Sequence, residues 1–482
     1  WPWPLVWLLA CAVVLAVDPW ALLQAGFWLS FVAVGVLFAT DTGANGEAPH
    51  AAGGLGLQRR AKAMLREQTI VTLALTPLSL LLFQQVSVVG LAANLVAIPW
   101  VTLVVTPLAL LGLIAAPIWD VAGAAIALLA RMLQMMAGWP GATVSVAAAT
   151  VAVSAAGVLG GALLVMRLPW GARALGLPLL LPVLLWQAPR PAPGQFELLV
   201  ADIGQGNAVL VRTATHSLIF DTGPRFGPDS DAGQLVLVPL LRALNERIDT
   251  VIVSHRDSDH SGGAEAVLKM QPQAHFVSSI EASHTLGKVR PIERCLAGQH
   301  WTWDGISFEI LHPQAADFDN APKPNAISCV LRIANGSHAA LLVGDIEKAQ
   351  EARLVAEVTA LLAADVLLVP HHGSKTSSTP AFIDAVHPRF ALVQAGYRNR
   401  FGHPAPPVVA RYDERQITLV DSSHCGAMAW SSADAMALGC ERDVQQRYWQ
   451  HRLAPRANAA LVAKKMRRAG DSEDEMVNAG IR

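Results

Sequence analysis

Long apolar segments fill the first part of the chain and restrict its fold more than any other feature. Of the 36 basic and 37 acidic residues, 13 lie in residues 1–190 and the other 60 lie in residues 191–482. A helix needs about 20 apolar residues to cross a bilayer. Seven segments approach or exceed that length: 4–17, 21–39, 69–84, 88–117, 121–138, 144–166 and 172–187. Residues 1–187 therefore predict a polytopic α-helical membrane domain with roughly five to eight spans.

Few polar residues interrupt these segments. Asn94 lies in the stretch VGLAANLVAIPW, which also contains Pro99. Polar groups inside a bilayer tend to face the protein interior or a water path, and proline interrupts a helix. Two interpretations stay open. In the first, a broken helix places Asn94 in the lining of a pore. In the second, the Asn94 side chain bonds a neighbouring helix.

The longest loop predicted in this part, 40–68, is basic. It contains four positively charged residues, Arg59, Arg60, Lys62 and Arg66. An excess of Lys and Arg marks the cytoplasmic side of a membrane protein. Because the number of spans is open, the sequence does not determine which side carries the remainder of the chain.

A proline-rich segment separates the apolar part from the rest. WQAPRPAPGQ (Trp186–Gln195) holds three prolines and one glycine, and proline neither continues a helix nor donates to a β ladder. We therefore predict a membrane domain over 1–187, a linker over 188–195 and a soluble domain over 196–435. The remaining residues, 436–482, read as a charged tail.

The soluble part alternates strand-like and helical runs. Its predicted strands are FELLVADIG, NAVLVRT, SLIFDTG, DTVIVSH, ISFEILHP, ADVLLVP, FALVQAG and ITLVDSS. The run ISCVLRIANGSHAALLVGD predicts a hairpin with a two-residue turn at Asn335–Gly336. Interleaved strands and helices indicate a layered α/β domain. We expect a β-sandwich flanked by helices, because hairpins rather than crossovers link the early strands.

Four side chains of metal-ligand type follow one apolar strand. The segment SHRDSDHSGG (Ser254–Gly263) contains His255, Asp257, Asp259 and His260 within six residues. Imidazole and carboxylate groups bind zinc or manganese. The competing interpretation is a polar helix start capped by Ser and Asp. The density of ligand-type side chains favours the metal site.

Two regions resemble known families. DPWALLQAGFWLSFVAVGVLF (Asp18–Phe38) and TPLSLLLFQQVSVVGLAANLVAIPWVTLVVTPLALLGL (Thr76–Leu113) resemble the competence domain of the ComEC family. Ser254–Gly263 resembles the metallo-β-lactamase signature HxHxDHxGG, with Asp257 at the second His position, a departure that occurs in the ComEC branch. The resemblance implies a membrane domain followed by an α/β metallo-β-lactamase-like (αββα sandwich) domain. Trp1 is not Met, so we interpret the chain as a C-terminal fragment that lacks the amino-terminal part of such a protein.

Further motifs follow in the order that the superfamily requires. DIGQGNAVL carries Asn207 where the branch has an acid, and FDTG places Asp221 at a strand end, either beside the metal loop or as a turn-stabilising residue. By resemblance, Asp345 bridges two metals, and one histidine of PHHGS is a ligand, for which we favour His371 over His372. GYRNRFGHP brings His403 near the site as an alternative last ligand. In KPNAISC the expected third His is Asn325.

These motifs assign roles to individual residues. We expect two divalent ions, zinc or manganese, that activate water for attack on a phosphodiester. The predicted ligands are His255, Asp257, Asp259, His260, Asp345 and His371. Asp259, His372, Lys375 and His403 are the catalytic candidates. Lys375, Arg398 and Arg400 are expected to bind DNA phosphates, with ordinary solvated charges as the alternative.

The ComEC resemblance implies a function in natural transformation. It implies a multi-pass protein of the bacterial inner membrane that contacts the lipid bilayer, single-stranded DNA and other proteins of the competence machinery. One DNA strand would pass through a channel and the soluble domain would degrade the other. A rival hypothesis is a channel whose soluble domain is inactive and only binds DNA, as Asn207 and Asn325 would allow. A lactonase or ribonuclease would leave the competence patterns unexplained.

The five cysteines give no sign of pairing. Cys11, Cys295, Cys329, Cys425 and Cys440 are scattered, odd in number and lack CxxC spacing. Neither a disulfide framework nor a cysteine zinc site is predicted. We expect them to be small buried apolar residues.

Overall fold

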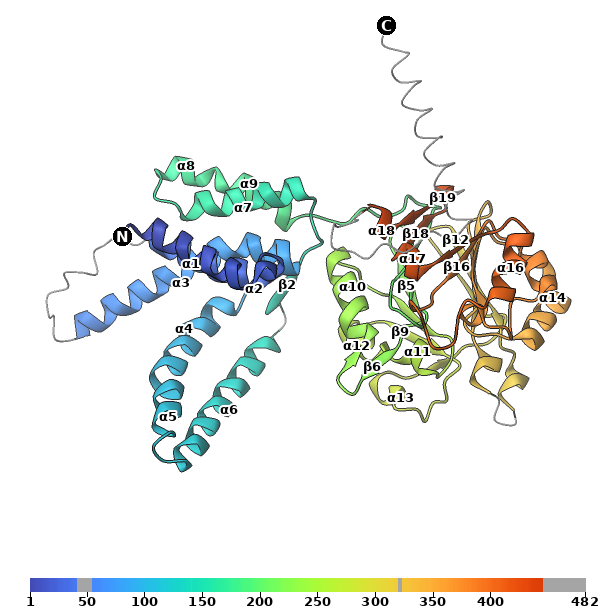
Figure 1. Ribbon diagram of the computed structural model, residues 1–482, viewed down its shortest axis with the longest axis horizontal. Helices are drawn as coiled ribbons and strands as arrows, with labels where there is room; N and C mark the ends of the chain where they lie inside the picture. The colour runs from blue at the N-terminus through green and yellow to red at the C-terminus, as the bar shows by residue number, and fades with distance from the viewer. Residues whose placement is uncertain (41–53, 140, 320–322, 445–482) are drawn as a thin grey trace, which may run out of the picture. The chain divides into compact units, whose positions relative to one another are not determined.

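The computed structural model describes residues 1–40, 54–139, 141–319 and 323–444, and the structural statements below refer to them (Figure 1). The chain forms two compact units. The first comprises Trp1–Ala188 with Arg242–Asn245, and the second comprises Pro189–Leu241 with Glu246–Arg482. Each unit is described by itself.

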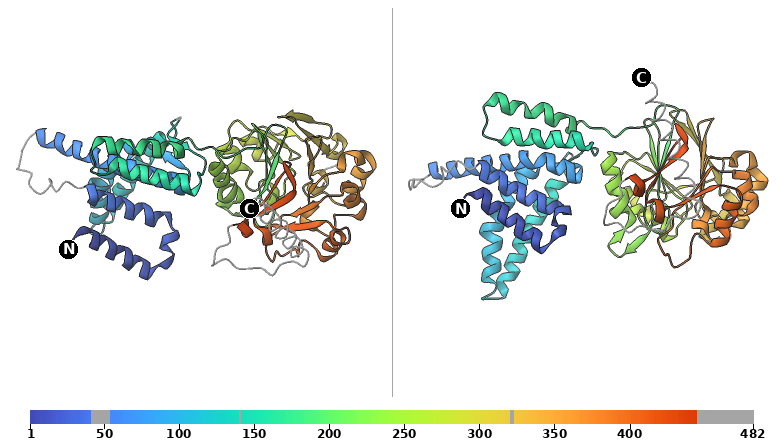
Figure 2. Two further views of the ribbon diagram at one scale, coloured as in Figure 1. Left: turned by 90° about the horizontal axis from the view of Figure 1, so that it is seen from above. Right: turned by 45° about the horizontal axis from the view of Figure 1, so that its top comes forward.

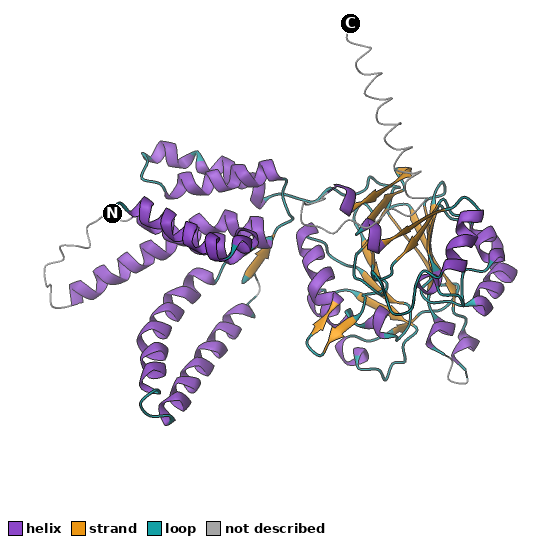
Figure 3. Cartoon of the chain, in the orientation of Figure 1, coloured by secondary structure: helices purple, strands orange, loops and turns teal. Residues whose placement is uncertain are grey.

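The first unit is helical, as predicted (Figure 3). Its helices are α1 (Trp3–Val17), α2 (Ala25–Thr40), α3 (Gly54–Phe83), α4 (Gly90–Trp100), α5 (Thr106–Leu111), α6 (Pro117–Ala137), α7 (Val151–Val165), α8 (Trp170–Ala174) and α9 (Gly176–Leu184). Strands β1 (Gln85–Ser87) and β2 (Thr143–Ser145) form a short antiparallel pair. Helices therefore lie in all seven apolar segments of the sequence, but their boundaries differ, most of all for α3.

Two helical stretches of this unit, Gly90–Leu111 and Pro117–Ala137, are long and apolar enough to cross a bilayer. The other apolar helices of the described residues, α1, α2, α7 and the stretch Trp170–Leu184, have 10–17 residues. Length and composition thus identify two candidate spans, fewer than the roughly five to eight expected from the sequence. The larger number stays a prediction.

The predicted loop 40–68 is wrong over its second part. Helix α3 begins at Gly54 and includes the basic run; residues 41–53 lie outside the described part of the chain. The segment after Gly54 is rich in Leu, Arg, Lys, Ala, Met and Glu and contains no proline before Pro77. Such residues favour a helix in water as well as in a bilayer. Apolar content therefore indicates where a membrane helix fits, not where a helix begins.

The helix break at Pro99, which one of the two interpretations of Asn94 required, is absent from this stretch. The chain stays helical from Gly90 to Leu111, with Pro99 inside α4 and a π-helical turn at Val101–Val105 directly after it. A π turn accommodates the backbone groups that a proline leaves without their usual partners. The side chain of Asn94 is exposed on this unit. Its place in a pore lining stays a prediction.

Glycines allow α7 to pack closely on its neighbours. A Cβ added to Gly160 would lie 2.6 Å from the carbonyl oxygen of Gly176 in α9, and one added to Gly161 would lie 2.5 Å from Pro77 of α3. Small residues at such positions let backbones approach, which is the usual packing of helices in a bilayer. This packing is consistent with the membrane domain predicted from the sequence.

The second unit contains two large sheets. The eight-stranded sheet has the order β10-β9-β8-β5-β4-β3-β18-β19, and the seven-stranded sheet has the order β11-β12-β13-β14-β15-β16-β17. The strands of the first are β3 (Glu197–Val200), β4 (Val209–Arg212), β5 (Ser217–Phe220), β8 (Thr250–Val253), β9 (His275–Ser278), β10 (Glu293–Arg294), β18 (Met428–Ser431) and β19 (Asp434–Cys440). Those of the second are β11 (His300–Trp303), β12 (Ile306–His312), β13 (Val330–Ala334), β14 (Ala339–Leu342), β15 (Val366–Leu368), β16 (Phe390–Val393) and β17 (Thr418–Asp421).

Helices cover the outer faces of both sheets. Figure 2 shows the green helices and the orange helices on opposite sides of the strands. The larger helices are α10 (Val238–Leu244), α12 (Ala264–Met270), α14 (Lys348–Leu362), α15 (Pro380–Val386) and α16 (Pro406–Glu414). Short elements complete the unit: β6 (Arg225–Gly227), β7 (Ser230–Asp231), α11 (Ser258–Ser261), α13 (Leu286–Val289), α17 (Ser422–Cys425) and α18 (Glu441–Val444). The predicted αββα sandwich is confirmed.

The main core lies between the two sheets. Strand residues that alternate along each sheet meet there, among them Leu198 and Phe220 of the first sheet and Phe308, Leu331 and Leu368 of the second. Burying a side chain of this size stabilises the fold by about 1.5–3 kcal/mol. A second cluster packs α14, α15 and α16 onto the outer face of the second sheet. Both cores hold the strand ends that carry the site.

The boundaries of this unit differ from the predicted ones. The proline-rich segment packs on it: the Arg190 guanidinium donates to Glu246 at 2.7 Å and to the Ser217 hydroxyl at 2.9 Å. At the other end, β19 and α18 extend the unit to Val444, beyond residue 435. A single arginine among prolines gives no sign in the sequence that its side chain is bonded to a distant strand.

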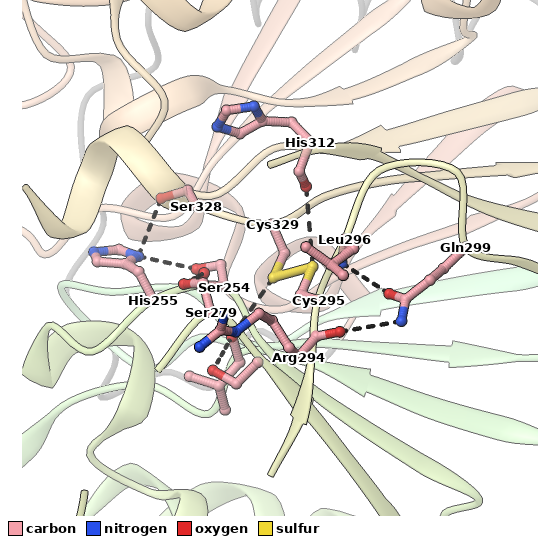
Figure 4. The surroundings of a disulfide bond; sticks show 12 residues. Ser254, His255, Ser279, Arg294, Cys295, Leu296, Gln299, His312, Ser328 and Cys329 are labelled. Atoms are coloured by element: carbon pink, nitrogen blue, oxygen red, sulfur yellow. Dashed lines mark hydrogen bonds between the residues drawn. A yellow bond between two sulfur atoms is a disulfide. The ribbon is translucent and has the colours of Figure 1, made fainter. Parts of the chain in front are cut away.

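Disulfides are present where none was predicted. Cys295 pairs with Cys329 (Figure 4), and Cys425 pairs with Cys440. The first joins the chain just after β10 to the chain just before β13 and so links the two sheets. Cys11 is free. Sequence spacing does not show which cysteines the strand order brings together.

The predicted hairpin joins β13 to β14, but its turn is longer than expected. Ala334 pairs with Ala339, so the loop has four residues, 335–338, rather than two. The Asn335 side-chain oxygen accepts from the backbone N–H groups of Ser337 and His338 at 3.1 and 2.8 Å. This local bonding of the Asn side chain selects the wider turn.

Candidate metal centre

The metal loop follows β8 and turns into α11 and α12. The chain can turn there because Gly262 and Gly263 lie against backbone. A Cβ on Gly262 would lie 2.3 Å from the Arg225 nitrogen, and one on Gly263 would lie 2.4 Å from the Thr222 carbonyl oxygen. The Gly-Gly pair of the motif is therefore a packing requirement of the loop.

Four side chains gather beyond this loop. Asp259, His260, Asp345 and His372 each offer one ligand atom, and these atoms lie within 4.8 Å of one another. His260 Nε2 is 3.1 Å from Asp345 Oδ1, and His372 Nε2 is 3.3 Å from Asp259 Oδ2 and 3.5 Å from Asp345 Oδ1. Two imidazoles and two carboxylates are a ligand set for zinc or manganese. Three of these four residues are buried.

Parallel strands bring the ligands together. Asp345 follows β14 and His372 follows β15, and these two strands are parallel neighbours. The carboxyl ends of parallel strands meet at one edge of the sheet. His371 and His372 both adopt positive φ, 50° and 54°, in the sharp turn that directs their rings to the cluster. The PHHG sequence thus forms a strained turn at the sheet edge.

Asp221 orients His260 rather than joining the cluster. It lies directly after β5 with φ of 58° and is fully buried. His260 Nδ1 donates to its Oδ2 at 2.8 Å, while the Ser254 N–H and hydroxyl donate at 2.6 and 2.9 Å. A carboxylate on Nδ1 fixes the tautomer that presents Nε2 to a metal. The interpretation of Asp221 as only a turn residue is therefore incomplete.

Gln394 performs the same task for His372. His372 Nδ1 donates to the Gln394 backbone oxygen at 2.9 Å. The Gln394 side chain in turn holds both ends of the DIGQGN turn, through Ala201 and Ala208. Sequence reasoning missed this residue. The available signal was a glutamine at the end of the otherwise apolar strand FALVQ.

His255 and Asp257 form a smaller group beside the cluster. His255 Nε2 lies 3.5 Å from Asp257 Oδ2, and the His255 ring is 4.2 Å from the His260 ring. Its Nδ1 lies 3.1 Å from the Ser254 hydroxyl and 3.3 Å from that of Ser328. Among the described residues, only the Asp259 cluster unites three or more ligand-type side chains. Asn325 does not belong to it.

Several buried polar atoms at this point have no hydrogen-bond partner. They are His255 Nε2, His260 Nε2, Asp345 Oδ1 and His372 Nε2. Leaving a buried polar group without a partner costs about 1–3 kcal/mol. Such atoms are satisfied together if they coordinate cations. The donor set therefore fits divalent metal ions.

The imidazole and carboxylate groups of the site shift the pKa values of one another. Burial raises the pKa of Asp259, but His372 and His260 outweigh it and lower this pKa to about 2. Burial likewise opposes ionisation of Asp345, yet His260 and His372 hold its pKa well below the usual value. For His260, burial lowers the pKa, and the carboxylates of Asp345 and Asp221 raise it well above 6.5. Both cluster carboxylates are thus ionised at neutral pH.

The two histidines of PHHG occupy places opposite to those expected from the sequence. His372 belongs to the cluster, whereas His371 lies at its side, with Nε2 3.6 Å from Asp345 Oδ2 and Nδ1 3.5 Å from Glu347. Local sequence is nearly symmetric for adjacent histidines. Only the turn geometry distinguishes them.

His403 lies near these residues but outside the cluster. Its ring centre is 5.9 Å from that of His371 and 6.5 Å from that of His372. Burial and the charges of these two histidines lower the pKa of His403 to about 4. Its buried Nδ1 has no hydrogen-bond partner. The structure thus brings His403 close, as the sequence predicts, without making it a fifth member.

The predicted basic residues lie on exposed loops. Lys375, Arg398 and Arg400 are all exposed. The hydroxyls of Ser377 and Ser378 are buried and bonded inside the protein to Pro370 and Tyr412. Asn207 is buried, and its backbone N–H donates to the Asp259 carbonyl oxygen at 3.1 Å.

Two family models match the chain. The model described as "Competence protein" covers residues 1–171, and the model described as "Metallo-beta-lactamase superfamily" covers residues 201–396. The second match, with the αββα sandwich, shows that the second unit has the metallo-β-lactamase fold. A solved structure of the metallo-β-lactamase fold protein YhfI from Bacillus subtilis is 13% identical, with a TM-score of 0.34 over 49% of this chain and 99% of that chain.

Curated relatives match both parts of the chain. It is 33% identical to the competence protein ComA of Neisseria gonorrhoeae over 92% of its length, which covers 61% of that protein. It is 30% identical to the uncharacterized protein YcaI of Escherichia coli, again over 92% of its length and 58% of the relative. The ComE operon protein 3 of Bacillus subtilis is 31% identical over 48% of this chain and 33% of the relative. The chain thus spans about three fifths of the length of the first two relatives.

Proposed function

Because the chain belongs to the ComEC family of competence proteins, we propose that it takes part in DNA uptake during natural transformation. Its first unit would contribute to a multi-pass channel of the bacterial inner membrane for single-stranded DNA. Its second unit would be a metal-dependent phosphodiesterase that degrades the strand that is not transported. The succession of a competence part and a metallo-β-lactamase part in one chain supports this combination.

The observation that carries the enzymatic part is the Asp259 cluster. Its four ligand atoms lie within 4.8 Å of one another, and the buried Nε2 and Oδ1 atoms lack other partners. Two divalent ions, zinc or manganese, would lower the pKa of a bound water and stabilise the charge on the oxygens of a phosphodiester. A phosphodiester suits such a pair because it is anionic and its developing negative charge would meet two cations.

The position of each residue relative to the cluster suggests its role in the reaction. Asp259, His260, Asp345 and His372 would hold one ion, and His255 and Asp257 would hold the other with Asp345 between them. His371, beside the cluster, would donate a proton to the leaving oxygen, and His403 would contact the substrate. Lys375, Arg398 and Arg400 would hold the DNA backbone in a manner that weakens with salt. Other competence proteins would deliver the DNA.

A second candidate function is DNA translocation with an inactive soluble domain. The pair His255 and Asp257 has no third ligand-type partner among the described residues, and Asn325, a poor metal ligand, stands where many superfamily members have a third His. One ion alone would bind DNA phosphate but polarise water less. In this candidate function the first unit would still be part of a channel, and the second unit would bind DNA without hydrolysing it.

The test uses the full chain in detergent with manganese or zinc and a fluorescent single-stranded oligonucleotide. We expect cleavage that requires metal and is abolished by chelation. Asp345→Asn should lose bound metal and activity by more than the ~10–100-fold that the loss of an outer-shell partner costs. Metal content, measured by mass spectrometry, separates loss of the ion from loss of chemistry.

The matched control is Asp384→Asn. Asp384 is an exposed carboxylate that pairs with Arg415 on the outer helix layer and lies outside the cluster. It should leave metal content and cleavage unchanged. If the wild-type chain binds metal stoichiometrically and still cleaves no DNA, the inactive-domain candidate replaces the phosphodiesterase.

A further inference from the structure

Among the residues of the second unit that the structure describes, exposed aromatic side chains are confined to two loops, one of them a β-hairpin. In the described part of this unit, the large aromatic residues that are exposed are Phe226, Tyr397 and Phe401, at 53%, 50% and 53%. Most other aromatic residues of the unit are buried in its cores, such as Phe220, Phe308 and Tyr412. Exposing an aromatic ring forgoes the burial that stabilises a fold. Their position therefore calls for a ligand rather than for packing.

The first loop, the β6–β7 hairpin, has Phe226 in the middle of β6 and adjoins the metal loop. The Thr222 N–H and hydroxyl each donate to the His260 carbonyl oxygen at 2.8 Å. Three residues later the hairpin begins, and its Arg225 nitrogen lies against Gly262. Phe226 is thus presented by a short strand that is anchored to the backbone of a cluster residue.

The second loop, between β16 and α16, is held rigid by Asn399. The Asn399 side chain donates to the carbonyl oxygens of Gly396 and His403 at 2.9 and 2.6 Å and accepts from the His403 N–H at 2.9 Å. A loop braced in this way presents Tyr397 and Phe401 in fixed positions. Little entropy is then lost when a ligand binds to it.

A series of rings connects this loop to the metal cluster. The Phe401 ring stacks on that of His403 with centres 5.6 Å apart, and the His403 ring lies 6.5 Å from that of His372. The distance between the ring centres of Phe401 and His372 is therefore at most the sum of these two distances. A few nucleotides of a single strand, at ~3.4 Å each when stacked, span such a distance.

Each exposed aromatic residue is next to an arginine. Arg398 lies 5.1 Å from the Tyr397 ring centre and Arg400 lies 4.8 Å from that of Phe401, while Arg225 precedes Phe226. Alternating aromatic rings and guanidinium groups are the usual surface for single-stranded nucleic acid. The rings stack on bases, and the arginines bind the phosphates between them.

We propose that Phe226, Tyr397 and Phe401, on two loops that adjoin the metal loop and the cluster, form a base-stacking surface that selects nucleic acid with unpaired bases. In a duplex the bases are stacked on one another and present only their edges in the grooves. A double-stranded substrate would therefore meet only the arginines. The inference rests on the proposed function for its substrate and adds the group by which the strand is recognised.

Stacking and phosphate binding are separable with an abasic strand. The full chain in detergent, with EDTA to prevent cleavage, is titrated into three fluorescent DNA probes by anisotropy. They are an oligothymidylate of about 15 nucleotides, an abasic strand of equal length and a duplex of equal length. We expect the oligothymidylate to bind most tightly, because only it offers accessible bases.

The variant Tyr397→Leu with Phe401→Leu should bind oligothymidylate at least ~30-fold more weakly, since it removes two stacked bases that contribute about 1–3 kcal/mol each. Its affinity for the abasic strand should not change. Tyr397→Phe with Phe401→Tyr keeps both rings and should bind like the wild type. Arg398→Ala should weaken binding of all three probes and reduce the salt dependence.

Met436→Ala is the control for an exposed apolar side chain outside the two loops, because Met436 is 62% exposed in β19. It should leave all three affinities unchanged. Equal binding of oligothymidylate and abasic strand by the wild type would overturn the proposal. The proposal would also be overturned if Tyr397→Leu with Phe401→Leu kept its affinity for DNA but no longer bound anionic lipid vesicles. The rings would then bind a membrane surface.

The outcomes separate this inference from the proposed function. Binding that depends on the rings, together with no cleavage after manganese is added, would retain the stacking surface and remove the phosphodiesterase. Cleavage of single strand, abasic strand and duplex at equal rates would retain the phosphodiesterase and remove the stacking surface.

Discussion

The carboxylate of Asp221 illustrates how a residue that touches no ligand can control the site. It accepts from His260 Nδ1 and from both donors of Ser254, and it is fully buried. Through these bonds it sets the position of His260 and, by way of Ser254, that of His255. Outer partners of this kind hold the ring orientation that a metal needs.

Asp221→Asn should therefore weaken metal binding by ~10–100-fold without unfolding the chain. The amide removes the charge that favours His260 Nδ1–H, while its size is unchanged. Competition with a fluorescent chelator measures the affinity, and circular dichroism checks the fold. An unchanged affinity would show that His260 is held by packing alone.

His312 is a buried histidine whose two ring nitrogens are both engaged. Nε2 donates to the Ala326 carbonyl oxygen at 2.9 Å, and Nδ1 accepts from the Arg353 guanidinium at 2.6 Å. A second ring proton would face the guanidinium. Burial and this cation lower the pKa of His312 from 6.5 to about 4. The neutral ring is therefore part of the native structure.

The stability of the second unit should depend on pH through this group. Because the folded pKa lies below the unfolded one, the unfolded chain binds more protons between pH 6.5 and 4, and stability falls as the pH falls through that range. The loss between pH 7 and 5 is about 2 kcal/mol. In His312→Gln this contribution should be absent. Urea titrations at both pH values, monitored by proteolysis, measure the free energy of unfolding of wild type and variant. An equal loss of stability in the two proteins as the pH falls would contradict the prediction.

The metal loop depends on a close approach between backbone segments. Gly262 lies against the start of β6 and Gly263 lies against Thr222 and Gly233. Neither glycine has a positive φ, so the requirement is space rather than backbone conformation. The strand ends would still converge without them, but α11 could not lie over the residues that follow β5.

Gly262→Ala should destabilise the second unit by about 1–3 kcal/mol, because the added methyl group meets backbone atoms that cannot move separately. It should also lower metal affinity, since His260 lies two residues before it. The matched control is Gly227→Ala in β6, where an added Cβ meets nothing within 4 Å. That variant should stay within about 0.5 kcal/mol of the wild type. Thermal unfolding of both proteins compares them, and equal midpoints would refute the packing argument.

The complete chain combines an apolar helical unit with a disulfide-linked sandwich. Both disulfides lie in the second unit. Cys329, which pairs with Cys295, also contacts the metal loop, because its N–H donates to the Ser254 carbonyl oxygen at 3.0 Å. Disulfides persist in oxidising compartments and are rare in the cytosol. We therefore expect the second unit to lie on the outer side of the inner membrane.

Thiol labelling in intact cells tests this expectation. A membrane-permeant maleimide should label only Cys11 before reduction and all five cysteines after reduction and unfolding. Reduction should also lower the stability of the second unit by about 3–4 kcal/mol for each loop closed, given sequence separations of 34 and 15. Labelling of Cys425 or Cys440 without reductant would place the unit in the cytoplasm.

The parts of the site that could be predicted were those encoded in contiguous motifs. His255, Asp257, Asp259 and His260 stand in one segment after an apolar strand, and the ends of such strands converge whatever the details of the fold. The choice between His371 and His372 could not be predicted, because adjacent residues are distinguished only by backbone torsions. Gln394 and Asp221 could not be recognised as ring-orienting groups, because their partners lie 22 and 39 residues away.

The sequence alone determined which segments are apolar, where strands alternate with helices and which side chains can bind a cation, since these properties depend on residues close together in the chain. Only the tertiary structure decided which cysteines pair, how the proline segment is held by Arg190, and which loops carry exposed rings beside the metal centre. Each of these depends on distances between segments far apart in sequence, and strand order and packing set those distances.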